Sequence, residues 1–454
     1  MTISPFGVFI IIYTLYVFAK RNLKKCYYLL WKFALLTEGV ISAGFFIRIG
    51  DISISPGLFF QVLLFLVAFF VRRNNRERKD RQLIFIFVLL VIINVGMLAI
   101  DPLKELVRSY GAADRSLEYY SIEDIYIYPS VGMQTITTAL MFVLFVINAL
   151  SFSSYISEEE WKKIEYGYIR IWKYLLYYLL FEFITKNIFH WYGYVKLLDW
   201  FFGADGVMVY VSSVSRSGLL VLIGLNVEPS HLLMLIIPFL FVYVLSDYDE
   251  KKGRKKNAYI ILTFILSVLS GSFRAVGMIP IIFLLMIIEY KPNGKIVASF
   301  SLLLITGFLL ESLGLLESLE RRLSSLIATV TNYNAGSYFA EGRVNTIIEA
   351  FGIFIKRPLF GCGLGTAFAY GFIPSALETF GLIGTMYWYR IMFFRVGNIR
   401  RIRNGRKYMI LLTIMWFYTN AISTGYMGTT LILCLSIAFY RDKLVYPEKN
   451  HRKE

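Results

Sequence analysis

The sequence has little charge and few cysteines for its length. Asp, Glu, Lys and Arg make up only 17% of the 454 residues, whereas hydrophobic residues make up 57%. A soluble protein of this size needs far more charge on its surface, so the composition is typical of a polytopic membrane protein. The cysteines, Cys26, Cys362 and Cys434, are widely scattered and predict neither a disulfide framework nor a Cys-x-x-Cys metal or redox motif.

The charge that is present is basic in excess, with 47 Lys and Arg against 31 Asp and Glu. Such an excess can indicate nucleic-acid binding or a lipid surface, but its distribution here indicates topology instead. Short basic segments lie at 20–25, 72–81, 162–173, 251–256, 291–295, 395–407 and 441–453. The chain between each consecutive pair of these segments is long enough for an even number of membrane crossings. This positive-inside pattern predicts that these segments and the C-terminus are cytoplasmic and that the N-terminus is outside. We expect no nucleic-acid partner.

Apolar runs predict an all-α polytopic membrane protein with about 12–14 transmembrane helices. The runs lie at 5–19, 27–47, 56–71, 82–100, 134–155, 169–186, 231–246, 257–271, 274–290, 297–310, 377–394, 408–424 and 427–440. The first run lacks a basic n-region and a small-residue cleavage site, so we interpret it as a retained helix. The pair at 257–290 is broken in the middle, and a re-entrant hairpin is an alternative there. No repeat or linker divides the chain, so 1–454 is predicted to be a single integral membrane domain.

Three long segments are predicted outside the membrane, at 101–134, 186–230 and 311–376. The second is rich in aromatic residues, which suits a surface at the level of the lipid headgroups. The third is predicted to be a long extracytoplasmic loop that carries short helices. Loops of this length in a compact membrane protein are usually functional.

The rest of the chain is organised around the stretch 341–388. A helix is predicted from Arg343 to the break at Pro358, because proline removes an N–H and restricts its predecessor. A loop with glycines at 361, 363 and 365 follows, whose backbone can approach a ligand closely. A polar link containing Glu378 then leads into the next apolar run.

Four polar clusters lie beside predicted helix ends on the external side. They comprise 212–218 with Arg216, 226–231 with Glu228 and His231, 270–274 with Arg274, and Arg343 with the glycine loop and Glu378. A helix start such as the one at Pro229 offers free N–H groups that favour phosphate. The alternatives are ordinary ones: the arginines contact lipid headgroups, Glu228 caps its helix, and His231 is a first-turn histidine.

Two motifs that suggest nucleotide or metal chemistry carry little weight. The Gly-x-Gly-x-Gly of 361–365 follows no strand and is predicted to face away from cytoplasmic nucleotides. The Asp-x-Asp of 247–249 lies in a charged cytoplasmic loop, where it is expected to be solvated. We therefore predict no cofactor and no metal site.

The order of these motifs resembles a family. The segments RSGLLVLIGLNVEPSHLLM (216–234), SGSFRAVGMIP (270–280), GRVNTIIEAFGIFIKRPLFGCGLG (342–365) and LETFGLIG (377–384) resemble the O-antigen and capsular polysaccharide polymerase and O-antigen ligase superfamily. The resemblance covers roughly the second half of the chain. Ligases of this superfamily tend to place a histidine ahead of the last glutamate, and this chain has none at 372–375. That difference favours a polymerase.

The resemblance implies a metal-independent glycosyltransferase of the bacterial plasma membrane, with its active site on the outer face. It would join oligosaccharide repeats carried on undecaprenyl pyrophosphate into O-antigen, capsule or exopolysaccharide. Its partners would be lipid-linked donor and acceptor, membrane lipids, a chain-length regulator and a flippase. The implied pyrophosphate-binding residues are Arg216, Arg274, Arg343, Gly363 and Gly365, and the candidate bases are Glu228, His231 and Glu378. An O-antigen ligase and a lipid-linked oligosaccharide flippase or transporter remain the alternatives; a transporter would be expected to show an internal repeat.

Overall fold

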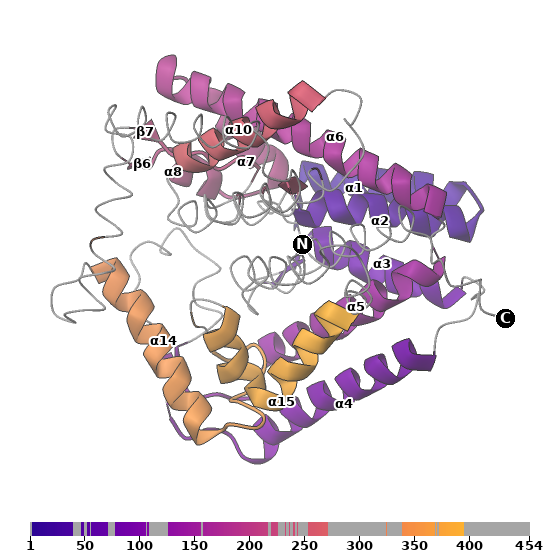
Figure 1. The fold of residues 1–454 in the computed structure, drawn as a ribbon, viewed down its shortest axis with the longest axis vertical. Helices are drawn as coiled ribbons and strands as arrows, with labels where there is room; N and C mark the ends of the chain where they lie inside the picture. Colours follow the sequence, from indigo (N-terminus) through magenta and orange to yellow (C-terminus); the bar gives the residue numbers. More distant parts are fainter. Residues whose placement is uncertain are drawn as a thin grey trace.

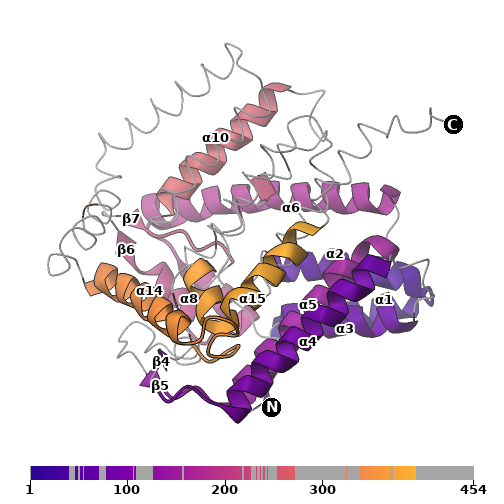
Figure 2. The ribbon, with the colours of Figure 1, turned by 60° about the horizontal axis from the view of Figure 1, so that its bottom comes forward.

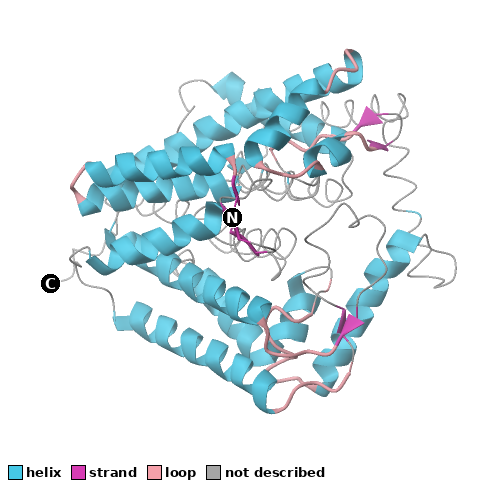
Figure 3. Cartoon of the chain, turned by 180° about the vertical axis from the view of Figure 1, so that it is seen from behind, coloured by secondary structure: helices cyan, strands magenta, loops and turns pink. Residues whose placement is uncertain are grey.

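A computed structural model describes the chain in segments. They are residues 2–39, 47–49, 52–54, 56–70, 78–105, 107–108, 126–155, 158–216, 219–225, 253–270, 338–367, 369 and 372–394, with single residues at 232, 236, 239, 240, 243 and 324. Most of these residues are helical, as predicted, and the strands among them are very short (Figure 3).

The elements follow one another along the chain in a simple order. The helices are α1 (Pro5–Ala19), α2 (Leu23–Gly39), α3 (Pro56–Phe70), α4 (Arg78–Ile100), α5 (Met133–Tyr155), α6 (Glu158–Phe183), the π-helix η3 (Ile184–Ile188), α7 (Gly193–Phe202), α8 (Val207–Ser212), α10 (Gly253–Leu269), α14 (Tyr338–Lys356) and α15 (Phe372–Phe394). The strands are β1 (Thr2–Ile3), β2 (Ile47–Ile49), β3 (Ile52–Ile54), β4 (Val107–Arg108), β5 (Tyr126–Ile127), β6 (Ser215–Arg216) and β7 (Leu219–Leu220). They pair antiparallel as β1-β2-β3, β4-β5 and β6-β7.

The helices pack in two groups joined through α3. In Figure 1, α1, α2, α6 and α10 lie in the upper half, and α4, α5, α14 and α15 lie in the lower half. Helix α3 contacts α2 on one side and α5 on the other. Helix α15 contacts both α4 and α14, as Figure 2 also shows. Helix α15, from the second half of the chain, is therefore held against α4, from the first half.

Aromatic side chains form much of the core that fixes α15. Phe87 of α4 and Phe142 of α5 both contact Trp388, with ring centroids 5.6 and 5.0 Å from the indole. All three side chains belong to a large buried cluster that extends from Phe6 of α1 to Ile391 of α15. Rings of this size bury much apolar area and prefer tilted contacts of this kind, so they fix how α15 lies against α4 and α5.

Among the residues that the structure describes, one helix segment combines the length and the apolar composition needed to cross a bilayer. It is Arg81–Ile100 of α4, and 28% of its most apolar window is buried. Shorter apolar helices occur at Pro5–Ala19, Pro56–Phe70, Thr135–Asn148 and Ala258–Leu269. Each of these five helices falls on a run that the sequence predicts as a crossing.

The predicted span 27–47 is wrong at its C-terminal end. Ile47 lies in β2, which pairs with β3 through Ile47↔Ile54. The sequence 47–54 alternates apolar and polar residues around Gly50 and Asp51, which is a hairpin pattern that the high local hydropathy obscures. The predicted spans 274–290, 297–310, 408–424 and 427–440 lie outside the described residues, and only single residues of 231–246 are described.

Candidate functional site

Helix α14 leads into the glycine loop, and it begins earlier than predicted. It starts at Tyr338, so Arg343 lies in its second turn rather than at its start. The first residues of α14, Tyr338 to Gly342, lack the apolar spacing on which the prediction relied. Its end at Lys356, two residues before Pro358, agrees with the predicted break. Gly361, Gly363 and Gly365 then have φ values of 68°, 108° and 73°, which L residues rarely adopt.

The link that contains Glu378 is helical, which corrects the prediction of a polar connection. Pro374 lies in the first turn of α15, where a missing N–H breaks no helical hydrogen bond. The real interruption comes later, at Gly381, whose φ of 67° and ψ of −172° break α15 into two parts. Only glycine adopts this conformation without strain.

The glycine loop lies in the break of α15 and satisfies its exposed backbone groups. Two N–H groups of the loop donate to carbonyls that end the first part of α15, and two N–H groups that begin the second part donate to carbonyls just before the loop. These bonds are Cys362 N to Glu378 O (2.7 Å), Gly363 N to Thr379 O (3.2 Å), Leu382 N to Pro358 O (2.7 Å) and Ile383 N to Leu359 O (3.3 Å). The broken ends of the helix are thus paired with the loop instead of with water.

Asn94 of α4 also binds the glycine loop and the end of the first part of α15. Its side-chain amide donates to Phe360 O at 2.6 Å and to Thr379 O at 2.9 Å. Its Oδ1 accepts from the backbone N–H of Leu364 at 2.9 Å. Asn94 is almost fully buried, so one polar side chain in an otherwise apolar helix holds both the loop and the end of the first part of α15.

Close backbone contact is the reason for glycine at these positions. A Cβ on Gly361 would lie 2.5 Å from Glu378 O, and one on Gly381 would lie 2.4 Å from the carbonyl of Leu359. The N–H of Gly363 donates to Thr379 O. Gly363 therefore has a structural role in the loop, and its predicted contact with pyrophosphate stays a prediction.

Glu378 is buried beside the loop. Its side chain is 2% exposed, and its Oε2 has no hydrogen-bond partner among the described residues. Burial raises the pKa of the neighbouring Cys362 thiol to about 12, and the Glu378 carboxyl adds to this rise. A buried carboxyl oxygen without a partner is costly, so Glu378 is a candidate to receive a proton or contact a substrate.

Ion pairs join the end of α14 to the end of α4. Arg357 donates to Asp101 at 2.8 Å, and Lys356 pairs with Glu105. The four residues come from the segments 101–134 and 311–376, both of which the sequence predicts outside the membrane. The structure thus brings these two predicted external segments together at one end of α4.

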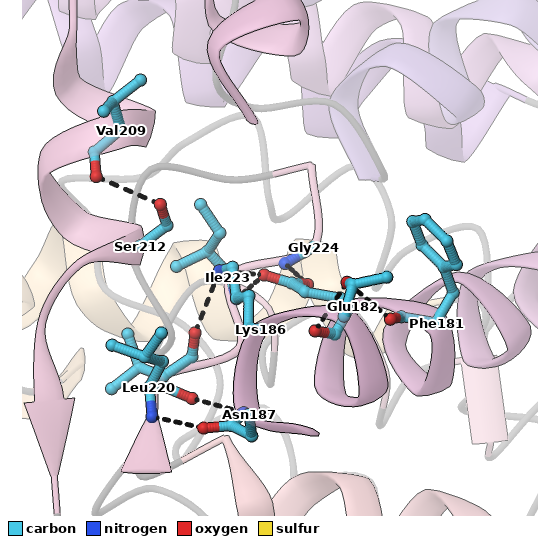
Figure 4. A network of polar contacts seen from close by, with 11 residues as sticks. Phe181, Glu182, Lys186, Asn187, Val209, Ser212, Leu220, Ile223 and Gly224 are labelled. Atoms are coloured by element: carbon cyan, nitrogen blue, oxygen red, sulfur yellow. Dashed lines mark hydrogen bonds and ion pairs between the residues drawn. The ribbon is translucent and has the colours of Figure 1, made fainter. Parts of the chain in front are cut away.

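The segment with Arg216 lies elsewhere, as a hairpin at the end of α6. Arg216 pairs with Leu219 across β6 and β7. The end of β7 and the chain after it are bound to α6 and η3 by Glu182, Lys186 and Asn187 (Figure 4). In Figures 1 and 2, the N-terminal end of α14 is the end nearer to this hairpin.

The described residues therefore include part of the predicted site. The backbones of Arg216 and Arg343 are placed but not their side chains, Gly365 has a positive φ, and Glu228, His231 and Arg274 lie outside the described residues. Sequence reasoning missed Asn94, Glu182 and Lys186. The signal that could have found them is a polar side chain inside or at the end of an apolar run. No protein-family model, curated protein or solved structure matches this chain.

Proposed function

We propose that this protein is a polysaccharide polymerase. It joins oligosaccharide repeats carried on undecaprenyl pyrophosphate into O-antigen, capsule or exopolysaccharide chains, on the outer face of the bacterial plasma membrane. The observation that carries the proposal is the unit formed by the last two motifs of the resemblance. Residues 358–364 and 378–383 are not continuous in sequence, yet they form one hydrogen-bonded unit beside the buried carboxyl of Glu378.

The exposed surfaces of α3 and α4 support a membrane location. Ile100, Phe69 and Phe85 are 83%, 79% and 69% exposed, and such large apolar side chains are stable in contact with lipid tails. The positive-inside distribution gives the orientation, and the ion pairs between 101–105 and 356–357 join two segments with the same expected side. The site beside Glu378 is then at the outer face.

The reaction needs a proton acceptor and stabilisation of the leaving group. A hydroxyl of the acceptor sugar attacks the anomeric carbon of the donor, its proton passes to a carboxylate or imidazole, and the lipid pyrophosphate leaves. Glu228, His231 and Glu378 are the candidates for the base. Arg216, Arg274 and Arg343 would bind the pyrophosphate, because the guanidinium fork contacts two phosphate oxygens at once.

The test uses the purified full-length protein and synthetic lipid-linked repeat units. Wild-type protein should produce a ladder of products that grows by one repeat at a time. Glu228→Gln or Glu378→Gln, whichever carboxylate is the base, should lower turnover by about 10²–10⁴-fold. Transfer of a repeat to a different lipid would identify a ligase, and movement of the repeat across vesicles without a new glycosidic bond would identify a flippase. No product from wild-type protein would overturn the proposal.

A further inference from the structure

A buried ion pair links α6 to the chain between Arg216 and Glu228. Glu182 and Lys186 are 1% and 0% exposed, and Lys186 Nζ lies 2.5 Å from Glu182 Oε1. The carboxylate also accepts from the backbone N–H groups of Ile223 at 3.1 Å and Gly224 at 2.9 Å. These contacts are drawn in Figure 4.

The lysine and its neighbour bind the same stretch of chain. Lys186 Nζ donates to Val221 O at 3.2 Å. Asn187 accepts from the N–H of Leu220 at 2.6 Å and donates to its carbonyl at 3.3 Å. Apart from the bond between Glu182 and Lys186, these side-chain contacts all go to the backbone of 220–224. Three polar side chains at the end of α6 and in η3 therefore hold four of the five residues 220–224.

The π-helix η3 explains how three side chains reach one stretch. Phe189 N donates to Ile184 O at 3.1 Å, five residues back, so this turn holds one residue more than an α-helical turn. Glu182 and Lys186 are four residues apart and share a face, and the wider turn brings Asn187 toward the same side. Turns of this kind occur frequently at functional sites.

Stability alone does not account for a buried ion pair, because well-packed apolar residues usually stabilise a core as well or better. The contacts of this pair select one segment of the chain. The Glu182 carboxylate binds the N–H groups of Ile223 and Gly224, and the Lys186 ammonium binds the carbonyl of Val221. The tethered stretch begins four residues after Arg216 and ends four residues before Glu228. We propose that Glu182, with Lys186, is a positioning residue that holds the chain after β7 and thereby fixes where Arg216 stands relative to the substrate. This inference rests on the proposed polymerase activity.

The experiment compares Glu182→Gln and the double variant Glu182→Gln/Lys186→Met with wild type. The single variant keeps an acceptor oxygen but leaves the Lys186 charge unpaired, whereas the double variant removes that charge and should fold like wild type. In both, kcat for chain extension should fall about tenfold to a hundredfold, as expected for loss of charge-assisted hydrogen bonds, with little change in KM. The double variant at wild-type kcat would overturn the inference.

A matched control is available on the same helix. Glu159 and Lys163 form an ion pair of the same spacing at 2.6 Å, but their side chains are 81% and 60% exposed. Glu159→Gln should leave kcat unchanged. If it lowers kcat as much as Glu182→Gln does, the effect belongs to α6 in general, and the positioning role is refuted.

A second readout separates this inference from the proposed function. Hydrogen exchange of the peptide covering 219–225 should become faster in the double variant, because the N–H groups of Ile223 and Gly224 lose their charged acceptor. Exchange in α5 should not change. Unchanged exchange at 219–225 would refute the tether even in an active enzyme, whereas faster exchange in a protein whose wild type makes no polymer would refute only the proposed activity.

Discussion

Replacing Asn94 by leucine tests whether one polar side chain holds the break in α15 closed. Leucine fills a similar volume but removes all three hydrogen bonds of the amide. Thr379 O still accepts from the N–H of Gly363. The carbonyl of Phe360 and the N–H of Leu364 lose their Asn94 contact without this compensation. Each buried group without a partner costs about 1–3 kcal/mol, so we expect a loss of about 2–6 kcal/mol in unfolding free energy.

The assay is equilibrium or thermal unfolding of the purified protein in detergent, with Asn94→Asp as a second variant. Aspartate keeps the acceptor for Leu364 but places a carboxylate oxygen against the carbonyls of Phe360 and Thr379, so it should destabilise at least as strongly. Ile92→Ala on the exposed face of the same helix is the control and should change little, because Ile92 is 61% exposed. If Asn94→Leu unfolds within about 0.5 kcal/mol of wild type, the amide does not hold the loop.

Further predictions concern the glycine loop and the motifs. Gly381→Ala should destabilise by more than about 1–2 kcal/mol, since its φ is positive and its Cβ meets Leu359, whereas Gly352→Ala in open space on α14 should be neutral or stabilising; thermal unfolding compares the two. The Cys362 thiol, buried and with a pKa of about 12, should resist alkylation at pH 8 until the protein unfolds, which mass spectrometry can follow. Arg343→Lys should lower chain extension about tenfold to a hundredfold, because lysine cannot form two parallel hydrogen bonds with pyrophosphate; equal activity would favour headgroup contact instead.

Local patterns were sufficient to predict most of the described helices. The apolar runs at α1, α3, α4 and α5 are long and uniform, and hydropathy alone locates them. The stop before Pro358 was also predictable, because proline acts on its immediate neighbours. These features depend on residues within a few positions of one another.

The break in α15 and the role of Asn94 could not be predicted in this way. The sequence around Gly381 reads as a continuous apolar helix, and the carbonyl that excludes a Cβ there belongs to Leu359, on another element. Asn94 binds Phe360, which is 266 positions away. The partner of a buried polar group is set by tertiary packing, so a sequence pattern can flag the group without identifying what it binds.

The distance along the chain between Asn94 and its partners has a consequence for biosynthesis. Asn94 and Leu364 are 270 positions apart, so at about 5–20 residues per second the ribosome needs roughly 15–55 s to supply the second after the first. During that interval α4 is complete but its amide lacks every partner described above. A nascent chain that stops before Leu364 would keep an unpaired polar group in an apolar helix, and quality-control proteases should remove it faster than chains that stop shortly after Ile383.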